Sequence, residues 1–115
     1  MTAGERAWVY VMTNAPRGVF YIGVTSDLER RVAEHKAGIG SQFVMRYKLF
    51  RLAWAEGFAR IDGAIAAEKR IKRWRREWKI RMIEETNPGW RDLASLERPP
   101  AMLQFPDSPL RGLPG

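Results

Sequence analysis

Apolar positions divide the first half of the chain into short segments that have the character of strands. Residues 8–12 form a continuous apolar run of the kind that a buried strand shows, which predicts a strand over 8–13, and a turn at 14–18 leads into a second predicted strand at 19–24. Two strands joined by so short a turn predict an antiparallel hairpin. Residues 49–55 alternate loosely between apolar and polar side chains, which predicts a third strand.

A capping box indicates the start of the first helix. Ser26 has the side chain of an N-cap, Glu29 follows three positions later, and Asp27 suits the positive end of the helix dipole. We expect this helix to run to about Lys36 and to stop at Gly38, a common C-terminal residue.

Two more helices and a change of composition complete the pattern. A long helix is expected over residues 60–74, with an apolar stripe at helical spacing made of Ile61, Ala64, Ile65, Ala67, Ile71 and Trp74. Another helix is expected over residues 77–85. Five of the seven prolines lie in residues 97–115, so this stretch is expected to be an extended or disordered tail. The chain therefore predicts one folded domain, residues 1–96, and a tail.

The charge of the chain indicates a polyanionic partner, nucleic acid first. Twenty Lys and Arg against thirteen Asp and Glu give a net charge of +7. The surplus is concentrated in residues 69–81, where eight of thirteen side chains are basic and two tryptophans are interleaved. A solvated helix face is the alternative, but so many like charges repel one another without a polyanion. We expect DNA binding by Lys69, Lys72, Arg73, Arg75, Arg76 and Lys79.

Composition excludes several other kinds of site. The absence of cysteine removes disulfides, thiol nucleophiles and thiolate metal sites, and a single histidine argues against zinc. No apolar run approaches the ~20 residues of a membrane span, and the short polar N-terminus does not resemble a signal peptide. We therefore expect a cytoplasmic protein that does not contact membranes.

Glu68 is the most informative single side chain. On a helical wheel it falls inside the apolar stripe of the helix over 60–74, not on the solvated face. A lone buried carboxylate is costly unless it is paired or binds a cation. A salt bridge to a neighbouring Lys or Arg explains the position as well as a bound metal does.

Four other side chains could share a site with this carboxylate. Arg31 and His35 are four residues apart and so lie on one helix face. A guanidinium near a buried face suits phosphate binding, although an arginine that extends to solvent and a structural histidine are the simpler interpretations. Tyr10 and Tyr21 are ordinary strand residues for which core packing is the default, with hydroxyls that need partners if buried.

The ordered set of these residues resembles the signature of the GIY-YIG endonuclease superfamily, in particular its small single-domain bacterial members. Tyr-Ile-Gly at 21–23 reproduces the second half of the signature. The first half is degenerate: Trp-Val-Tyr at 8–10 keeps the tyrosine and lacks the glycine. The similarity extends over residues 8–93, nearly the whole of the expected domain.

The remaining matched segments supply the other positions of the signature. Arg31 has the family's spacing from Tyr21, so it is preferred over Arg30 as the counterpart of the catalytic arginine. Residues 67–72 are similar to the helix that carries the metal-binding glutamate, here Glu68. Asn87 occupies the family's late polar position.

The resemblance implies a fold and a reaction. It implies an α+β domain with a small three-stranded antiparallel sheet flanked by helices. It also implies hydrolysis of DNA phosphodiester bonds to 5′-phosphate and 3′-hydroxyl ends with one Mg²⁺ or Mn²⁺ ion, held by Glu68. Since no separate specificity domain is evident, we expect cleavage that is weakly selective or guided by DNA structure, in repair or recombination.

The resemblance also implies a role for each side chain. Arg31 would bind the scissile phosphate, and Tyr21 would orient phosphate or water. Tyr10 would be the general base, helped by His35. A phenol with a pKa near 10 is a poor base at neutral pH, so the site must favour phenolate or pass the proton on. The expected supporting residues are Gly23 and Asn87.

Two alternatives to a nuclease remain open on the sequence. The first is a nucleic-acid-binding accessory module that has this fold and little activity of its own. The second is a basic structural or ribosome-associated protein in which the tyrosines and Glu68 belong to the core. Metal-dependent cutting of DNA by the purified chain distinguishes the nuclease from both.

Overall fold

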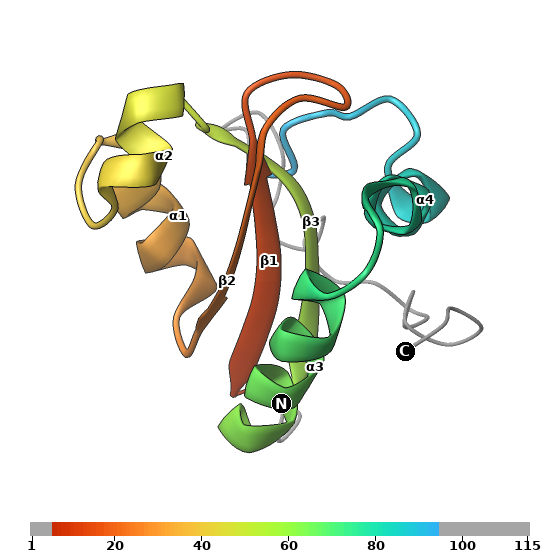
Figure 1. Cartoon of the computed structure of the whole chain (residues 1–115). Coiled ribbons are helices and arrows are strands. Elements are labelled where there is room, and N and C mark those ends of the chain that lie inside the picture. Colours follow the sequence, from red (N-terminus) through yellow and green to blue (C-terminus); the bar gives the residue numbers. More distant parts are fainter. Residues whose placement is uncertain (1–5, 95–115) are drawn as a thin grey trace.

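The computed structural model of the 115-residue chain describes residues 6–94. Its elements along the chain are β1 (Ala7–Thr13), β2 (Phe20–Thr25), α1 (Leu28–Lys36), α2 (Gln42–Tyr47), β3 (Arg51–Phe58), α3 (Ile61–Lys72) and α4 (Arg76–Thr86). The strands form one antiparallel sheet in the order β2-β1-β3, so β2 is an edge strand (Figure 1). The expected α+β fold, a three-stranded antiparallel sheet flanked by helices, is confirmed.

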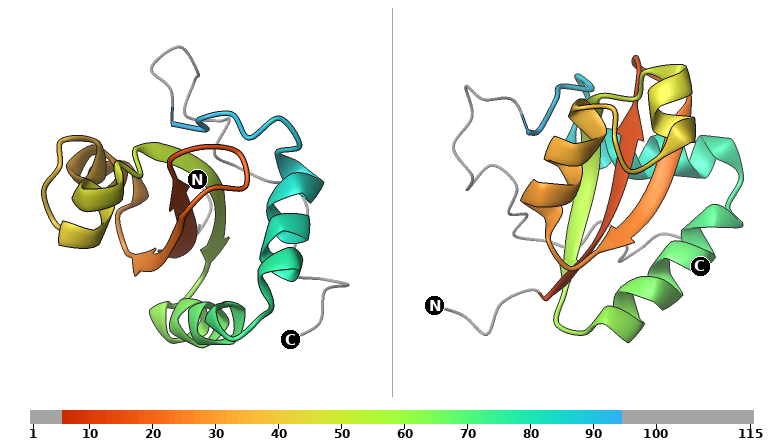
Figure 2. Two further views of the ribbon diagram at one scale, coloured as in Figure 1. Left: turned by 45° about the horizontal axis from the view of Figure 1, so that its top comes forward. Right: turned by 90° about the vertical axis from the view of Figure 1, so that its left-hand side faces the viewer.

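Helices cover both faces of the sheet. Alternate side chains of a strand point to opposite faces. Val9 and Val11 of β1 therefore pack in a core with α3 and α4, whereas Tyr10 and Met12 pack in a second core with α1 and α2. Figure 2 shows α1 and α2 on one side of the sheet and α3 and α4 on the other. The sheet separates the two helical layers.

The start of α1 differs from the expected capping box. The N-cap is Asp27, not Ser26, and its carboxylate accepts a hydrogen bond from the backbone N–H of Arg30 at 3.2 Å. The hydroxyl of Thr25 accepts the N–H of Asp27 at 3.0 Å, which keeps Asp27 extended and delays the helix by one residue. Glu29 lies in the first turn, without the reciprocal bond of a capping box.

The helix α2 is not expected from the sequence. Its N-cap is Ser41, whose hydroxyl accepts the backbone N–H of Val44 at 3.2 Å. Gly38 and Gly40 lead into it with positive φ angles, a conformation that glycine adopts without a Cβ penalty. Val44 is the single buried residue of this six-residue helix, so no apolar stripe is present in the sequence to predict it.

The apolar stripe of α3 is narrower than expected. Ala64, Ala67 and Ile71 are buried, but Ile61 and Ile65 are exposed. The small side chains of the two alanines allow the helix to approach the sheet closely. The face of α3 that lies against the sheet is therefore the one that carries residues 64, 67 and 71. Glu68 therefore lies at the margin of the buried stripe, not inside it.

The structure does not describe the expected tail, and it contains no membrane-spanning helix within the described residues. The predicted tail, residues 97–115, and the domain boundary at residue 96 lie outside the described residues. Among residues 6–94, no helix is both long enough and apolar enough to cross a membrane.

Candidate active site

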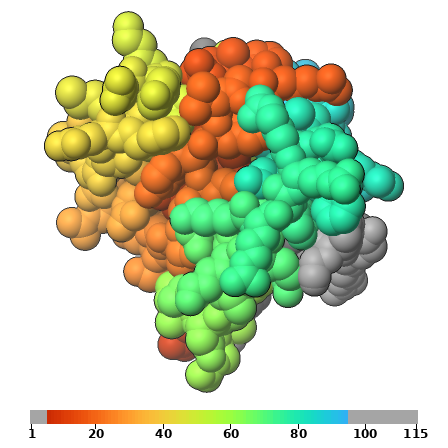
Figure 3. Space-filling model, in the orientation of Figure 1, coloured from red at the N-terminus to blue at the C-terminus, as the bar shows by residue number. Residues whose placement is uncertain are grey.

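The candidate site is built at the sheet edge by β1, β2 and α1. The antiparallel register places Tyr10 of β1 opposite Gly23 of β2. Tyr21, two residues before Gly23, has its side chain on the same face. The helix α1 lies over this face and brings Arg31 and His35 to the two tyrosines. In Figure 3 the β2 edge, in orange, lies exposed between yellow α2 and green α3.

Gly23 provides the space in which the Tyr10 ring lies. A Cβ atom at position 23 would lie 2.6 Å from the Tyr10 hydroxyl oxygen and 2.8 Å from the ring carbon that carries it. The ring therefore crosses the edge strand at a residue without a side chain. In this chain, the Tyr-Ile-Gly motif therefore needs glycine at position 23 because a Cβ atom there would collide with the Tyr10 side chain.

Replacement of Gly23 by alanine is expected to displace Tyr10 and to destabilise the fold by about 1–3 kcal/mol, the usual cost of overpacking. Gly63→Ala is the matched control, because a Cβ there meets only the Phe58 ring at an ordinary 3.7 Å and alanine favours a helix. Urea unfolding measures both variants. A Gly23→Ala protein as stable as wild type would show that Tyr10 does not need this space.

Three aromatic rings meet beside Gly23. The hydroxyl oxygen of Tyr10 lies 2.8 Å from Nε2 of His35, and both side chains are almost fully buried. The half-buried ring of Tyr21 packs edge-on to His35, with centroids 5.3 Å apart. Nδ1 of His35 has no hydrogen-bond partner among the described residues, so no contact fixes which ring nitrogen carries the proton.

Burial keeps both members of the Tyr10–His35 pair neutral. Burial raises the pKa of Tyr10 far above its usual value, and the nearby Tyr21 adds to this, while Arg31 opposes it. Burial, followed by the charge of Arg31, lowers the pKa of His35. A resident phenolate is therefore disfavoured, whereas a neutral imidazole at hydrogen-bond distance can accept the phenol proton. A tyrosine base must be either a resident phenolate or a phenol that passes its proton on, and this geometry supports transfer of the Tyr10 proton to His35.

The buried His35 is expected to make stability depend on pH. Folding lowers its pKa below the ordinary 6.5, so the unfolded chain binds the proton more readily. The contribution of neutral, buried His35 to the free energy of unfolding is complete above pH 6.5. It is lost as the pH falls through the lowered pKa of the folded state. Urea unfolding between about pH 7.5 and about pH 5 should show wild type losing more stability than His35→Gln. Parallel pH profiles would exclude His35 as the titrating group.

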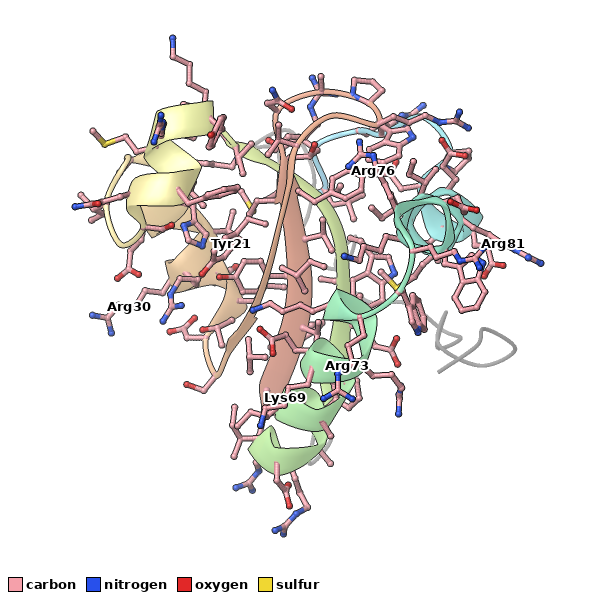
Figure 4. The ribbon with its side chains drawn as sticks, in the orientation of Figure 1. Tyr21, Arg30, Lys69, Arg73, Arg76 and Arg81 are labelled. Carbon is pink, nitrogen blue, oxygen red and sulfur yellow. The ribbon has the colours of Figure 1, made fainter. Side chains whose placement is uncertain are left out.

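The two neighbouring arginines of α1 have different surroundings. Arg31 is 40% exposed, and its interaction with the Tyr10 hydroxyl is the main cause that raises its pKa. Arg30 is 77% exposed and points away into solvent, as Figure 4 shows. Both lie 3.4 Å from Glu34. Arg31, and not Arg30, is the arginine that interacts with the Tyr10 hydroxyl.

Glu68 comes from the other helical layer. It lies on α3, which packs on β1 and β2 from the opposite face of the sheet. Its side chain is 15% exposed, and its carboxylate lies 2.7 Å from Nζ of Lys72, so the salt bridge that was the alternative to a metal is present. The structure thus brings together four of the five expected catalytic side chains, with Glu68 on the far side of the edge strand.

The surroundings of Glu68 are compatible with a hydrated divalent cation. Within residues 6–94 there is no group of three or more His, Cys, Asp or Glu that could bind a metal. A cation would therefore take most of its ligands from water and phosphate, which is the coordination that Mg²⁺ prefers. Lys72 is mostly exposed, so its ammonium can leave the carboxylate without being buried.

Asn87 supports the framework at the β3 side of the sheet. Its side-chain amide donates to the carbonyl oxygens of Ala53 and Arg91 at 3.0 and 2.9 Å, and its Oδ1 accepts the N–H of Arg91. These bonds attach the segment after α4 to β3. Among the described residues, none of its hydrogen bonds reaches the Tyr10–His35 pair.

The basic residues of α3 and α4 differ in exposure and in how far contacts within the protein already engage them. Lys69 and Arg73 are exposed and line a hollow of about 570 Å³ with Trp74 and Trp78. Figure 4 shows Lys69 and Arg73 on the α3 side of β2, across from Tyr21.

Other members of the basic set make contacts within the protein. Arg76 lies over the Phe20 ring, 4.4 Å from its centroid, and donates to carbonyl oxygens of the β1–β2 turn. Lys79 donates to the carbonyl of Lys72, and burial lowers the pKa of Lys79. Arg75 is highly exposed, and its ion pair with Glu77, also highly exposed, is long at 3.9 Å. Arg76 and Lys79 are therefore less free for phosphate than Lys69, Arg73 and Arg75 are.

Comparison with known proteins gives consistent matches. Residues 6–81 match the GIY-YIG catalytic domain. A UPF0213 protein of Streptococcus pneumoniae serotype 4 is 35% identical over 81 residues, which cover 70% of this chain and 81% of that protein. A UPF0213 protein of Lacticaseibacillus paracasei is 34% identical over 89 residues, or 77% of this chain and 99% of that protein. No solved structure matches the chain.

Proposed function

The chain belongs to the GIY-YIG catalytic domain family, a family of nucleases, and from this premise we propose that it is a metal-dependent DNA endonuclease. The observation that carries the proposal is the hydrogen-bonded Tyr10–His35 pair with the partly exposed Arg31 interacting with the Tyr10 hydroxyl. A neutral acid–base pair beside an exposed cation is suited to activating water next to a bound phosphate.

Arg31 binds the scissile phosphate in this proposal. Its guanidinium is charged and partly exposed, and it interacts with the carboxylate of Glu34 and with the Tyr10 hydroxyl. Two parallel N–H groups match two phosphate oxygens. As Arg31 turns to the phosphate, it uncovers the Tyr10 hydroxyl to the attacking water.

The proton of that water leaves through Tyr10 and His35. Tyr10 accepts a proton from water while its own proton passes to Nε2 of His35, 2.8 Å away. The resulting hydroxide attacks phosphorus, the bond to the 3′ oxygen breaks, and that oxygen takes a proton from solvent. Tyr21 lies against His35 and orients the phosphate or the water by its hydroxyl.

Glu68 would hold the divalent metal, Mg²⁺ or Mn²⁺, whose remaining ligands would come from water and phosphate. When bound, the metal stabilises the charge that develops on the phosphate oxygens and the leaving oxygen. Lys69, Arg73 and Arg75 contact the DNA backbone without reading its sequence. Since such contacts do not read sequence, we expect cleavage that is weakly selective or guided by DNA structure, in repair or recombination.

The chemistry of the cut ends tests this proposal. A nick made in plasmid DNA should be sealed by DNA ligase with no other treatment, because ligase requires a 5′-phosphate and a 3′-hydroxyl. Nicks that need a phosphatase and a kinase before sealing would contradict the mechanism. Salt-sensitive binding with no cutting would instead support the accessory DNA-binding module.

A further inference from the structure

The helix α2 carries an exposed apolar surface next to the candidate active site. Phe43 and Tyr47 are 43% and 41% exposed, and the neighbouring Ile39 and Met45 are each 57% exposed. Figure 1 shows α2 next to α1, on the same side of the sheet. An exposed cluster of large apolar side chains is typical of an interaction surface.

Aromatic contacts connect this surface to the site. The Phe43 ring lies 6.3 Å from that of Tyr21 and 4.8 Å from that of Tyr47, centroid to centroid. Tyr21 in turn packs against His35. A series of rings therefore leads from the buried Tyr10–His35 pair to the open surface of α2.

The charge around these rings is positive. The guanidinium of Arg46 lies 5.6 Å from the centroid of the Tyr47 ring, and Lys48 follows at the exposed end of the helix. The sequence has no acidic residue between Glu34 and Glu56. Exposed aromatic rings among basic side chains are the combination that binds single-stranded nucleic acid, by stacking and by charge.

We propose that Phe43 and Tyr47 stack on unpaired bases of the DNA strand whose phosphate is held at Arg31. Paired bases are covered by their neighbours in the duplex, so an exposed ring can stack only on a base that is free. The substrate class is thus DNA with single-stranded nucleotides next to the cleaved bond. The part of this inference that concerns the cleaved bond rests on the proposed function. The part that concerns binding of unpaired bases does not.

Binding measured in EDTA tests the stacking directly. A labelled single-stranded oligonucleotide and a duplex of equal length are titrated with wild type and with the double variant Phe43→Leu/Tyr47→Leu, which keeps apolar side chains at both positions and removes the π-faces. We expect the variant to lose about 5- to 150-fold in affinity per stacked base for the single strand and to bind the duplex nearly as wild type does. Met45→Leu, at a position on the same helix that is even more exposed than the two rings, is the control and should bind both as wild type.

Three results would overturn the proposal. One is unchanged single-strand binding by the double variant; another is an equal loss for single strand and duplex. The third is a wild-type dimer that becomes monomeric in the double variant, because a second copy of the chain would then cover α2. If the double variant fails to fold, Tyr47→Leu alone gives the same comparison. Absence of cleavage with Mg²⁺ in wild type would refute the proposed function alone, since the EDTA titration still decides the stacking.

Discussion

Replacement of Glu68 by glutamine is expected to reduce metal-dependent DNA cleavage by about 10³-fold or more. A metal ion contributes several kcal/mol of charge stabilisation in the transition state, and each 1.4 kcal/mol is a factor of ten in rate. Glutamine keeps the shape of the side chain but removes the charge that holds the cation. Single-turnover cleavage of labelled DNA with Mg²⁺ measures the effect.

Stability separates this effect from a folding defect. The partner of Glu68 is the exposed Lys72 at (i, i+4) spacing, and such surface pairs contribute only about 0.3–0.5 kcal/mol. Glu68→Gln should therefore unfold at nearly the wild-type urea concentration. Glu77→Gln, which changes a highly exposed carboxylate on α4, should retain full cleavage. A Glu68→Gln protein that cuts at the wild-type rate would remove this residue from the metal site.

Replacement of Arg31 by alanine is expected to reduce cleavage by roughly 10²–10³-fold, the usual cost of removing one group that stabilises transition-state charge. Its guanidinium interacts with the Tyr10 hydroxyl, where in the proposed mechanism a phosphate would meet the attacking water. The same single-turnover assay measures the loss, and a plot of rate against DNA concentration separates binding from the chemical step.

Arg30→Ala is the matched control for this prediction. Arg30 is the neighbouring residue on the same helix, has the same charge and lies the same 3.4 Å from Glu34, but it points to solvent. Its loss should weaken DNA binding only slightly, by charge, and leave the chemical step unchanged. Equal effects of the two substitutions would mean that α1 contributes only positive charge.

Much of the fold could be predicted from local patterns. The apolar runs within 8–13 and 19–24 predict β1 and β2 to within a residue or so, because a buried strand requires them. The helix α2 could not be predicted in this way, since a single buried side chain, Val44, leaves no periodicity.

The candidate site shows a similar division. The resemblance selects Tyr10 and Gly23 separately, but the reason they occur together is the pairing of β1 with β2, which places a Cβ-free position under the Tyr10 ring. The wheel places Glu68 inside the stripe of α3, and only the packing of Ala64 and Ala67 on the sheet shifts it to the margin. Tertiary packing, which a helical wheel does not contain, decides such positions.

The most direct test of a metal-dependent nuclease is the cleavage rate of the full chain on labelled DNA that joins duplex and single-stranded segments, with Mg²⁺ and with EDTA. We predict cutting with Mg²⁺ that stops on addition of EDTA and returns when Mg²⁺ is restored. Equal cutting in EDTA, or no cutting of this or of linear and branched DNA while tight salt-sensitive binding persists, would contradict it.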